Sequence, residues 1–246
     1  MNTKEEVFTQ PAFILHHRVY RNTSLIIDVF SRDYGRLSLV AKGVKRKKSP
    51  LKGVLQSFQP LNLSWVRRTE LGTLVDAELQ NPIIQLAHEN LYSGLYVNEI
   101  ISRLLPTFDS VPELFQTYFE TLYVLSKNER NVTVALRLFE KQLLASLGYE
   151  IPLLEEIVHD SPIQKSKYYE YLPEQGFIES EVNMLSKMQF KGEHLLALSA
   201  NQLDSEEILK TAHRLMHINL KRLLGDEPLK SRELYRSYKS MMSSPD

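Results

Sequence analysis

The first eighty residues alternate apolar and polar side chains with a period of two, the pattern of half-buried β-strands. Leu37, Leu39 and Ala41 would face one side of a strand, with Arg36 and Ser38 on the other. Short stretches of this kind, rich in β-branched and aromatic residues, predict five strands: Ala12–Tyr20, Ser24–Ser31, Arg36–Val44, Phe58–Val66 and Thr73–Leu79. Five short strands suit a small closed barrel. The OB-fold is the commonest five-stranded choice, and an SH3-like barrel would produce much the same pattern.

Near Asn81-Pro82 the apolar period changes from 2 to 3.6, which predicts helices. The expected helices are Leu86–Leu105, Pro112–Ser126, Val132–Leu147, Asp204–Leu224 and Ser231–Met241. Three prolines interrupt residues 150–200, where Tyr168, Tyr169 and Tyr171 cluster. We therefore predict an α+β chain, with an N-terminal five-stranded OB-fold β-barrel at 1–80 and an all-helical C-terminal domain at 81–246.

The formal net charge of zero conceals an uneven distribution. Residues 1–80 hold 13 Lys/Arg against 7 Asp/Glu, and residues 81–246 hold 17 against 23. This asymmetry predicts an anionic partner for the N-terminal part.

The positive charge is concentrated between residues 16 and 52, with ten Lys/Arg and two acidic residues. A cationic loop beside a small barrel suits nucleic-acid backbone binding, because neutralising phosphates releases condensed counterions. A merely solvated basic loop is the alternative. The candidate DNA-binding residues are Arg18, Arg21, Tyr34, Arg36, Lys42, Lys45, Arg46, Lys47, Lys48 and Lys52.

Aromatic residues between these cations favour a single-stranded ligand, since bases stack on exposed rings. Tyr20 and Tyr34 are flanked by arginines and are the better surface candidates. Phe58 and Trp65 are expected in the barrel core.

Enzyme signatures are not found in the sequence, and we predict no catalytic residues and no cofactor. There is no cysteine, no phosphate-binding G-x-x-x-x-G-K-[ST] loop and no G-x-S-x-G or H-E-x-x-H motif. His213 and His217 could share a metal, but no further ligand stands at a matching spacing, so no metal site is predicted. Without a signal peptide or an apolar run of roughly 18 residues, we expect a soluble cytoplasmic protein that does not enter membranes.

The helix expected near the C-terminus carries a basic stripe beside an apolar one. Lys210, Arg214, His217 and Lys221 recur at helical spacing on one face. Such a face could bind an acidic peptide with an apolar end. An ordinary amphipathic helix with a solvated face is the alternative.

Several ordered motifs make the chain resemble the RecO family of DNA-repair proteins. In the N-terminal part they are Ala12–Leu15, Tyr20–Ser24, Gly35–Gly43 and Ser49–Leu51. Farther on they are Arg137–Leu144, Leu147–Tyr149, Pro173–Phe177 and Leu229–Arg232.

The resemblance implies an OB-fold followed by a helical domain, and work without nucleotide hydrolysis. The implied activities are annealing complementary single strands and helping to load the recombinase onto DNA coated by single-strand-binding protein. The implied partners are single-stranded and duplex DNA, RecR and the acidic C-terminal tail of single-strand-binding protein, in the cytoplasm at the bacterial nucleoid. Many members carry a four-cysteine zinc module where this chain has residues 150–200 without cysteine, so zinc is not carried over.

Two other readings remain open at this point. The first is a general single-stranded nucleic-acid binding protein, acting on RNA, with an OB barrel and a helical interaction domain. The second is a helical enzyme with an OB appendage, which no residue spacing supports.

Overall fold

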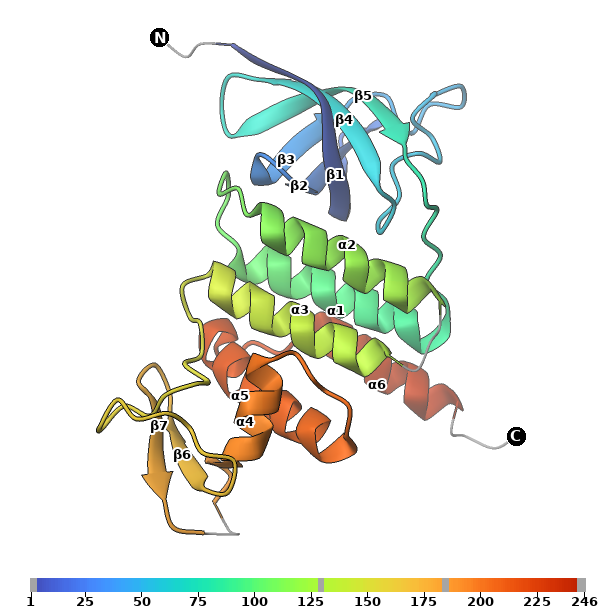
Figure 1. The fold of residues 1–246 in the computed structure, drawn as a ribbon. Helices are drawn as coiled ribbons and strands as arrows, with labels where there is room; N and C mark the ends of the chain where they lie inside the picture. The colour runs from blue at the N-terminus through green and yellow to red at the C-terminus, as the bar shows by residue number, and fades with distance from the viewer. Residues whose placement is uncertain (1–3, 128–130, 183–185, 243–246) are drawn as a thin grey trace. The chain divides into compact units, whose positions relative to one another are not determined.

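The computed structural model describes residues 4–127, 131–182 and 186–242. The chain divides into two compact units (Figure 1). The first joins Met1–Val132 with Glu227–Asp246, and the second is Thr133–Asp226.

The first unit begins with five strands that pair in the order β1-β2-β3-β5-β4 and form a closed barrel. The strands are β1 (Glu5–Tyr20), β2 (Ser24–Ser31), β3 (Gly35–Ala41), β4 (Leu61–Arg67) and β5 (Leu71–Leu79). β1 closes the ring, because its first half pairs with β4 and its second half with β2. Inward-facing side chains, including Ile27, Leu39, Leu63 and Trp65, fill the interior.

The five predicted strands are confirmed, with one large difference in bounds. β1 starts at Glu5 rather than Ala12. The register between β1 and β4 shifts between Val7 and Gln10, and Thr9 has a φ of 50° there. This bulge interrupts the alternation of apolar and polar residues by which a strand is recognised in a sequence. The first residues of β1, before the bulge, therefore could not be recognised as part of the strand.

Three helices complete this unit: α1 (His88–Leu104), α2 (Pro112–Lys127) and α6 (Lys230–Met242). The apolar face of α2 packs on the outside of the barrel. The Phe13 and Phe30 rings from β1 and β2 each lie 5.4 Å from the Phe115 ring, and 5.0 and 5.8 Å from the Tyr118 ring. This shared core groups the helices with the barrel in one compact unit, and the domain boundary expected at residues 80 and 81 stays a prediction.

The prediction that residues 81–246 are all-helical is wrong, because the second unit contains strands. Besides α3 (Val132–Ser146), α4 (Gly192–Ser199) and α5 (Glu206–Leu224), it contains a three-stranded sheet of order β7-β6-β8. The strands are β6 (Tyr168–Leu172), β7 (Gly176–Ser180) and β8 (Gln189–Lys191). Tyr169 and Tyr171 alternate with an exposed Glu170 and are buried, and the Tyr171 ring lies 4.9 Å from the Phe177 ring. The tyrosine cluster is therefore a strand that buries one face.

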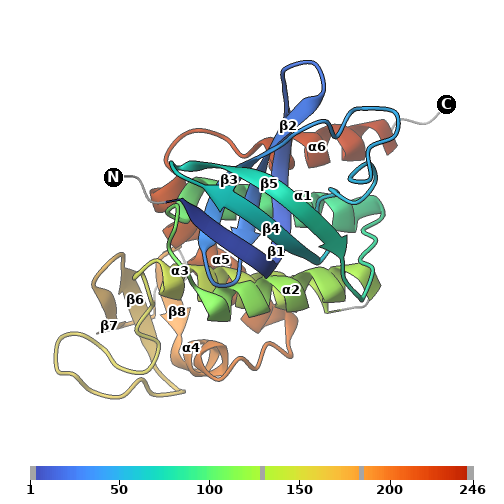
Figure 2. The ribbon, with the colours of Figure 1, turned by 90° about the horizontal axis from the view of Figure 1, so that it is seen from above.

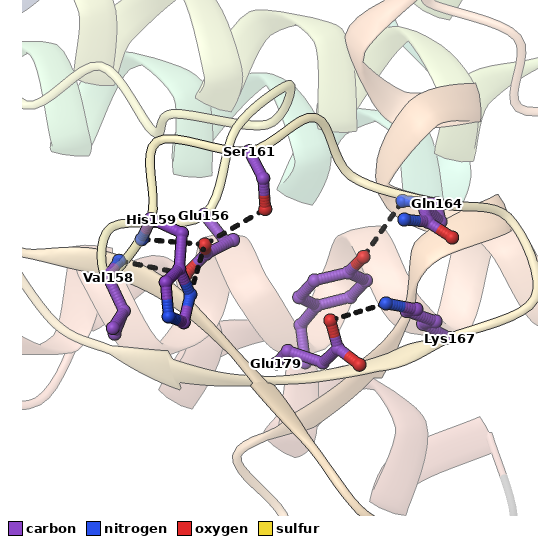
Figure 3. Close-up of polar contacts among 8 residues, drawn as sticks. Glu156, Val158, His159, Ser161, Gln164, Lys167 and Glu179 are labelled. Atoms are coloured by element: carbon purple, nitrogen blue, oxygen red, sulfur yellow. Dashed lines mark hydrogen bonds and ion pairs between the residues drawn. The ribbon is translucent and has the colours of Figure 1, made fainter.

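A buried carboxylate organises the loop that precedes this sheet (Figure 3). Glu156 is 2% exposed and accepts hydrogen bonds from the Val158 and His159 amides, both at 2.8 Å, and from the Ser161 hydroxyl at 2.9 Å. These donors, led by the Val158 amide, lower the pKa of Glu156 to about 2. The loop is thus held by one ionised side chain.

Candidate nucleic-acid interface

The turn between β1 and β2 and the segment that follows β3 lie together at one end of the barrel. Leu25 pairs with Ala41 at this end of the β2–β3 ladder. The Lys45 amide then donates a 3.0 Å hydrogen bond to the Thr23 carbonyl in the turn. In the view from above the barrel, the chain leaving β3 passes beside that turn (Figure 2).

Six cations project from this segment, which we call the basic segment, residues 42–52. It winds through successive tight turns, with Arg46 to Gly43 and Ser49 to Arg46 amide–carbonyl bonds of 3.0 and 3.1 Å. Val44 is buried in the barrel core and anchors it. All six cations are exposed, and within the described residues none forms an ion pair: Lys42, Lys45, Arg46, Lys47, Lys48 and Lys52. These six positive charges repel one another, and a bound polyanion would remove that repulsion.

The end of β1 and the β1–β2 turn add two arginines and an aromatic ring to this end. Arg21 is exposed at a φ of 53°, and its guanidinium carbon lies 5.1 Å from the centroid of the Tyr20 ring. Arg18 lies 3.5 Å from the Asp28 carboxylate, with 58% of its side chain exposed. The predicted residues Arg18 and Arg21 therefore share an end with the basic segment.

Tyr34 and Arg36 lie at the other end of the β2–β3 ladder, where Ser31 pairs with Gly35. Strand geometry puts about 20 Å between the two ends. The Tyr34 ring meets the buried Trp65 ring edge-on at 5.2 Å, and the Arg36 Nε donates to the Leu105 carbonyl at 2.8 Å. Both side chains are half-buried, so the structure does not bring them to the basic segment.

Two arginines, Arg67 at the end of β4 and Arg68 in the turn to β5, are not among the predicted residues because they fall outside the longest basic run. Arg67 pairs with Glu5 and stacks 4.3 Å above the Phe108 ring. Arg68 is exposed. The start of β5 at Leu71 pairs with Ser38, so this turn lies toward the Arg36 end of β3.

The stripe expected on α5 is only partly open. Lys210, His217 and Lys221 are exposed, and Lys210 pairs with Glu206 at 2.6 Å. Arg214 instead donates to the Gln189 carbonyl and lies 4.3 Å above the Phe190 ring. Burial lowers the pKa of this guanidinium. Arg214 therefore ties α5 to the small sheet.

Residues 150–200 do not fit the zinc module that the resemblance to the RecO family suggests, because the chain has no cysteine. Among the described residues no three His, Cys, Asp or Glu side chains gather as metal ligands. Glu156, in the corresponding region, already accepts bonds from its own loop, and Lys167 pairs with Glu179 at 2.6 Å on the neighbouring strand (Figure 3).

Comparison with known proteins identifies the family. A model described as "Recombination protein O N terminal" matches residues 4–83, and one described as "Recombination protein O C terminal" matches residues 86–233. The chain belongs to the RecO family. It is 40% identical over 234 residues to the DNA repair protein RecO of Marinobacter nauticus, covering 94% of this chain and 95% of the relative. It is 42% identical over 226 residues to that of Aliivibrio salmonicida, covering 92% and 94%.

The family membership makes this a DNA repair protein and accounts for the ordered motifs of the sequence. In the part of the chain that the structure describes, no helix is long and apolar enough to cross a membrane.

Proposed function

We propose that this chain is a non-enzymatic recombination mediator that binds single-stranded and duplex DNA through the basic segment and the β1–β2 turn. The observation that carries the proposal is the hydrogen bond from Lys45 to Thr23, which joins these two exposed basic elements. Arg18, Arg21, Lys42, Lys45, Arg46, Lys47, Lys48 and Lys52 are the proposed phosphate contacts. Tyr34 and Arg36 would contact DNA only if the bound DNA strand extends from the basic segment to the opposite end of the barrel.

The proposal includes an OB-fold barrel. The strand order β1-β2-β3-β5-β4, with the antiparallel β1–β2–β3 run and the parallel β3–β5 pair, supports it. OB-folds bind oligonucleotides through strands 2 and 3 and the loops after strands 1 and 4. In this chain Phe30 on β2 is covered by α2, which favours binding at the barrel end rather than across that face.

Strand annealing follows from the same electrostatics. Two DNA strands repel one another, and a surface with several unpaired cations screens both and holds them close. Bases that stack on a ring such as Tyr20 stay available for pairing. No bond is made or broken by the protein, so this activity needs neither nucleotide nor metal.

The second half of the proposal concerns protein partners. RecR and the acidic tail of single-strand-binding protein are the proposed partners, with the tail at Lys210, His217 and Lys221 on α5. Arg214 is assigned a positioning role there, since it holds α5 against β8. We place this work in the cytoplasm, at the nucleoid.

Annealing of complementary DNA coated with single-strand-binding protein tests the proposal. We expect the chain to accelerate annealing with the intact coat protein and to lose the effect when the coat protein lacks its terminal tail. Annealing that ignores the tail would contradict the mediator role. A parallel titration with RNA separates a general nucleic-acid binder, which would bind both polymers equally.

A further inference from the structure

Helix α6 is held on α1 by two glutamates, one near each of its ends. Glu99 accepts the Lys230 and Ser231 amides, both at 2.8 Å, and the Ser231 hydroxyl at 2.6 Å. A carboxylate at a helix N-terminus satisfies amides that the helix leaves unpaired. Ten residues earlier on α1, Glu89 pairs with Lys239 and accepts the Tyr235 hydroxyl at 3.2 Å. The two helices therefore run antiparallel.

Tyrosines fill the space between these two contacts. The Tyr92 ring of α1 lies 5.6 Å from the Tyr235 ring and 5.0 Å from the Tyr238 ring. Figure 1 draws α6 alongside α1, on the side away from the barrel. Because one face of α6 is fixed to α1, the two flanks of the helix next to that face have fixed orientations and are open to solvent.

One flank of α6 is basic. Arg232 and Arg236 are four residues apart, and Lys239 follows three residues later on the same flank. Both arginines are exposed, and in the described part of the chain neither forms an ion pair. The arginines stand about 6 Å apart along the helix axis. Each guanidinium offers a planar fork that matches a phosphate.

The other flank of α6 is apolar, which decides between a nucleic acid and an acidic peptide. Leu234 and Met241 are 53% and 76% exposed, but at 100° per residue they lie far round the helix from Arg232. A peptide docking on the arginines would gain no apolar contact there. A phosphate chain needs only the charges.

We propose that the Arg232–Arg236 flank of α6 is a second contact for the DNA backbone, separate from the basic segment. The inference rests on the proposed function, because it requires a DNA-binding protein. The two contacts lie on different elements of this unit, so only a DNA strand long enough to span from the barrel end to α6 would meet both. The flank therefore adds affinity for long DNA and none for short DNA.

The test compares Arg232→Gln/Arg236→Gln with Lys165→Gln/Lys187→Gln, a matched loss of two exposed cations elsewhere. Affinity for a fluorescent single strand is measured against salt concentration, once with about 12 nucleotides, an OB-fold site size, and once with a strand several times longer. On the long strand the α6 variant should bind roughly fivefold or more weakly, and its log–log salt slope should fall by about 1.4. The matched control should bind like the wild type on both strands.

The outcomes separate the inference from the proposed function. Equal binding by wild type and α6 variant on the long strand overturns the inference, and so does an equal loss in the matched control. In either case, weakened binding by Lys47→Gln/Lys48→Gln in the basic segment leaves the proposed function standing. Failure of the wild type to bind either strand would overturn both.

Discussion

Gly35 is the first residue of β3, directly after the turn from β2, and a side chain does not fit there. Its φ is +63°, and a Cβ at this position would lie 2.0 Å from the Asp109 carbonyl oxygen. Side chains strain a left-handed backbone, and here the backbone of the segment before α2 also blocks the space. The backbone before α2 can therefore approach this turn closely only because residue 35 is glycine.

We expect Gly35→Ala to lower the free energy of unfolding of the protein by about 3 kcal/mol, the sum of backbone strain and overpacking. Gly53→Ala is the matched control, since its φ is +91° but nothing lies within 4 Å of a Cβ there. The control should cost only about 1 kcal/mol. Urea denaturation measures both, and equal losses would contradict the close approach to Asp109.

Glu156 makes the stability of the second unit depend on pH. Its folded pKa of about 2 lies below the ordinary value of 4.5, so the ionised form stabilises the fold. This contribution is complete above the ordinary pKa and is lost as the pH falls from 4.5 to about 2. Glu156→Gln should lower the melting temperature at pH 7 by roughly 5 °C.

The difference in melting temperature between wild type and Glu156→Gln should shrink as the pH falls through that window. Glu155→Gln, an exposed neighbour, is the control and should change little. A constant difference from pH 7 to pH 2 would show that the carboxylate charge is not what holds the loop.

At the scale of elements, a short polar relay joins the barrel to α1 and α2. Asn98 on α1 donates to the Leu15 carbonyl of β1 at 2.9 Å and accepts the Tyr118 hydroxyl of α2 at 2.7 Å. All these groups are buried, and burial raises the pKa of Tyr118. Buried polar groups are costly unless they are hydrogen-bonded, so the relay fixes how the three elements meet.

Asn98→Ala should therefore lower the free energy of unfolding by about 2–3 kcal/mol, because it removes one hydrogen bond from a buried carbonyl and one from a buried hydroxyl. Chemical denaturation checks the value. Asn22→Ala, in the exposed β1–β2 turn, should stay within about 0.5 kcal/mol of the wild type. A cost at Asn98 as small as the control would mean that the relay does not couple the elements.

The elements that follow a simple period were predictable from the sequence, and the others were not. The five barrel strands and the helices matching α1, α2, α3, α5 and α6 carry clear periods of two or 3.6. The strands β6 to β8 are three to five residues long, so even the alternation in β6 covers too few residues to identify a strand from the sequence. The helix expected from Asp204 begins two residues later, at Glu206, and Ser205 caps it by accepting the Ile208 amide.

The candidate site was predictable only where it is contiguous in sequence. The exposure of the basic segment could be predicted from the sequence, because a run of consecutive cationic side chains in a loop is not buried. Arg36 was grouped with it by proximity in sequence, yet strand length carries Arg36 to the opposite end of the ladder. Arg232 and Arg236 are far from residues 42–52 in sequence, and only the packing of α6 on α1 defines where they point.

At the scale of the whole molecule, the net charge is zero, but residues 1–80 carry an excess of Lys and Arg and residues 81–246 an excess of Asp and Glu. The unit that contains the barrel carries the basic segment, the β1–β2 turn and the α6 flank. Because exposed cations bind DNA by releasing counterions, the division predicts a DNA affinity that falls steeply with salt despite the neutral total. A salt-independent affinity would point to stacking or apolar binding instead.

The central claim is that the basic segment binds the DNA backbone, and charge reversal tests it most directly. Affinity for a single strand is measured across salt concentrations for the wild type and for Lys45→Glu/Arg46→Glu/Lys47→Glu/Lys48→Glu. Each lost phosphate contact should reduce the slope of log affinity against log salt concentration by about 0.7, so four lost contacts should reduce it by about 3. Tight binding at low salt should also be abolished. An unchanged affinity and slope would place the DNA elsewhere on the protein.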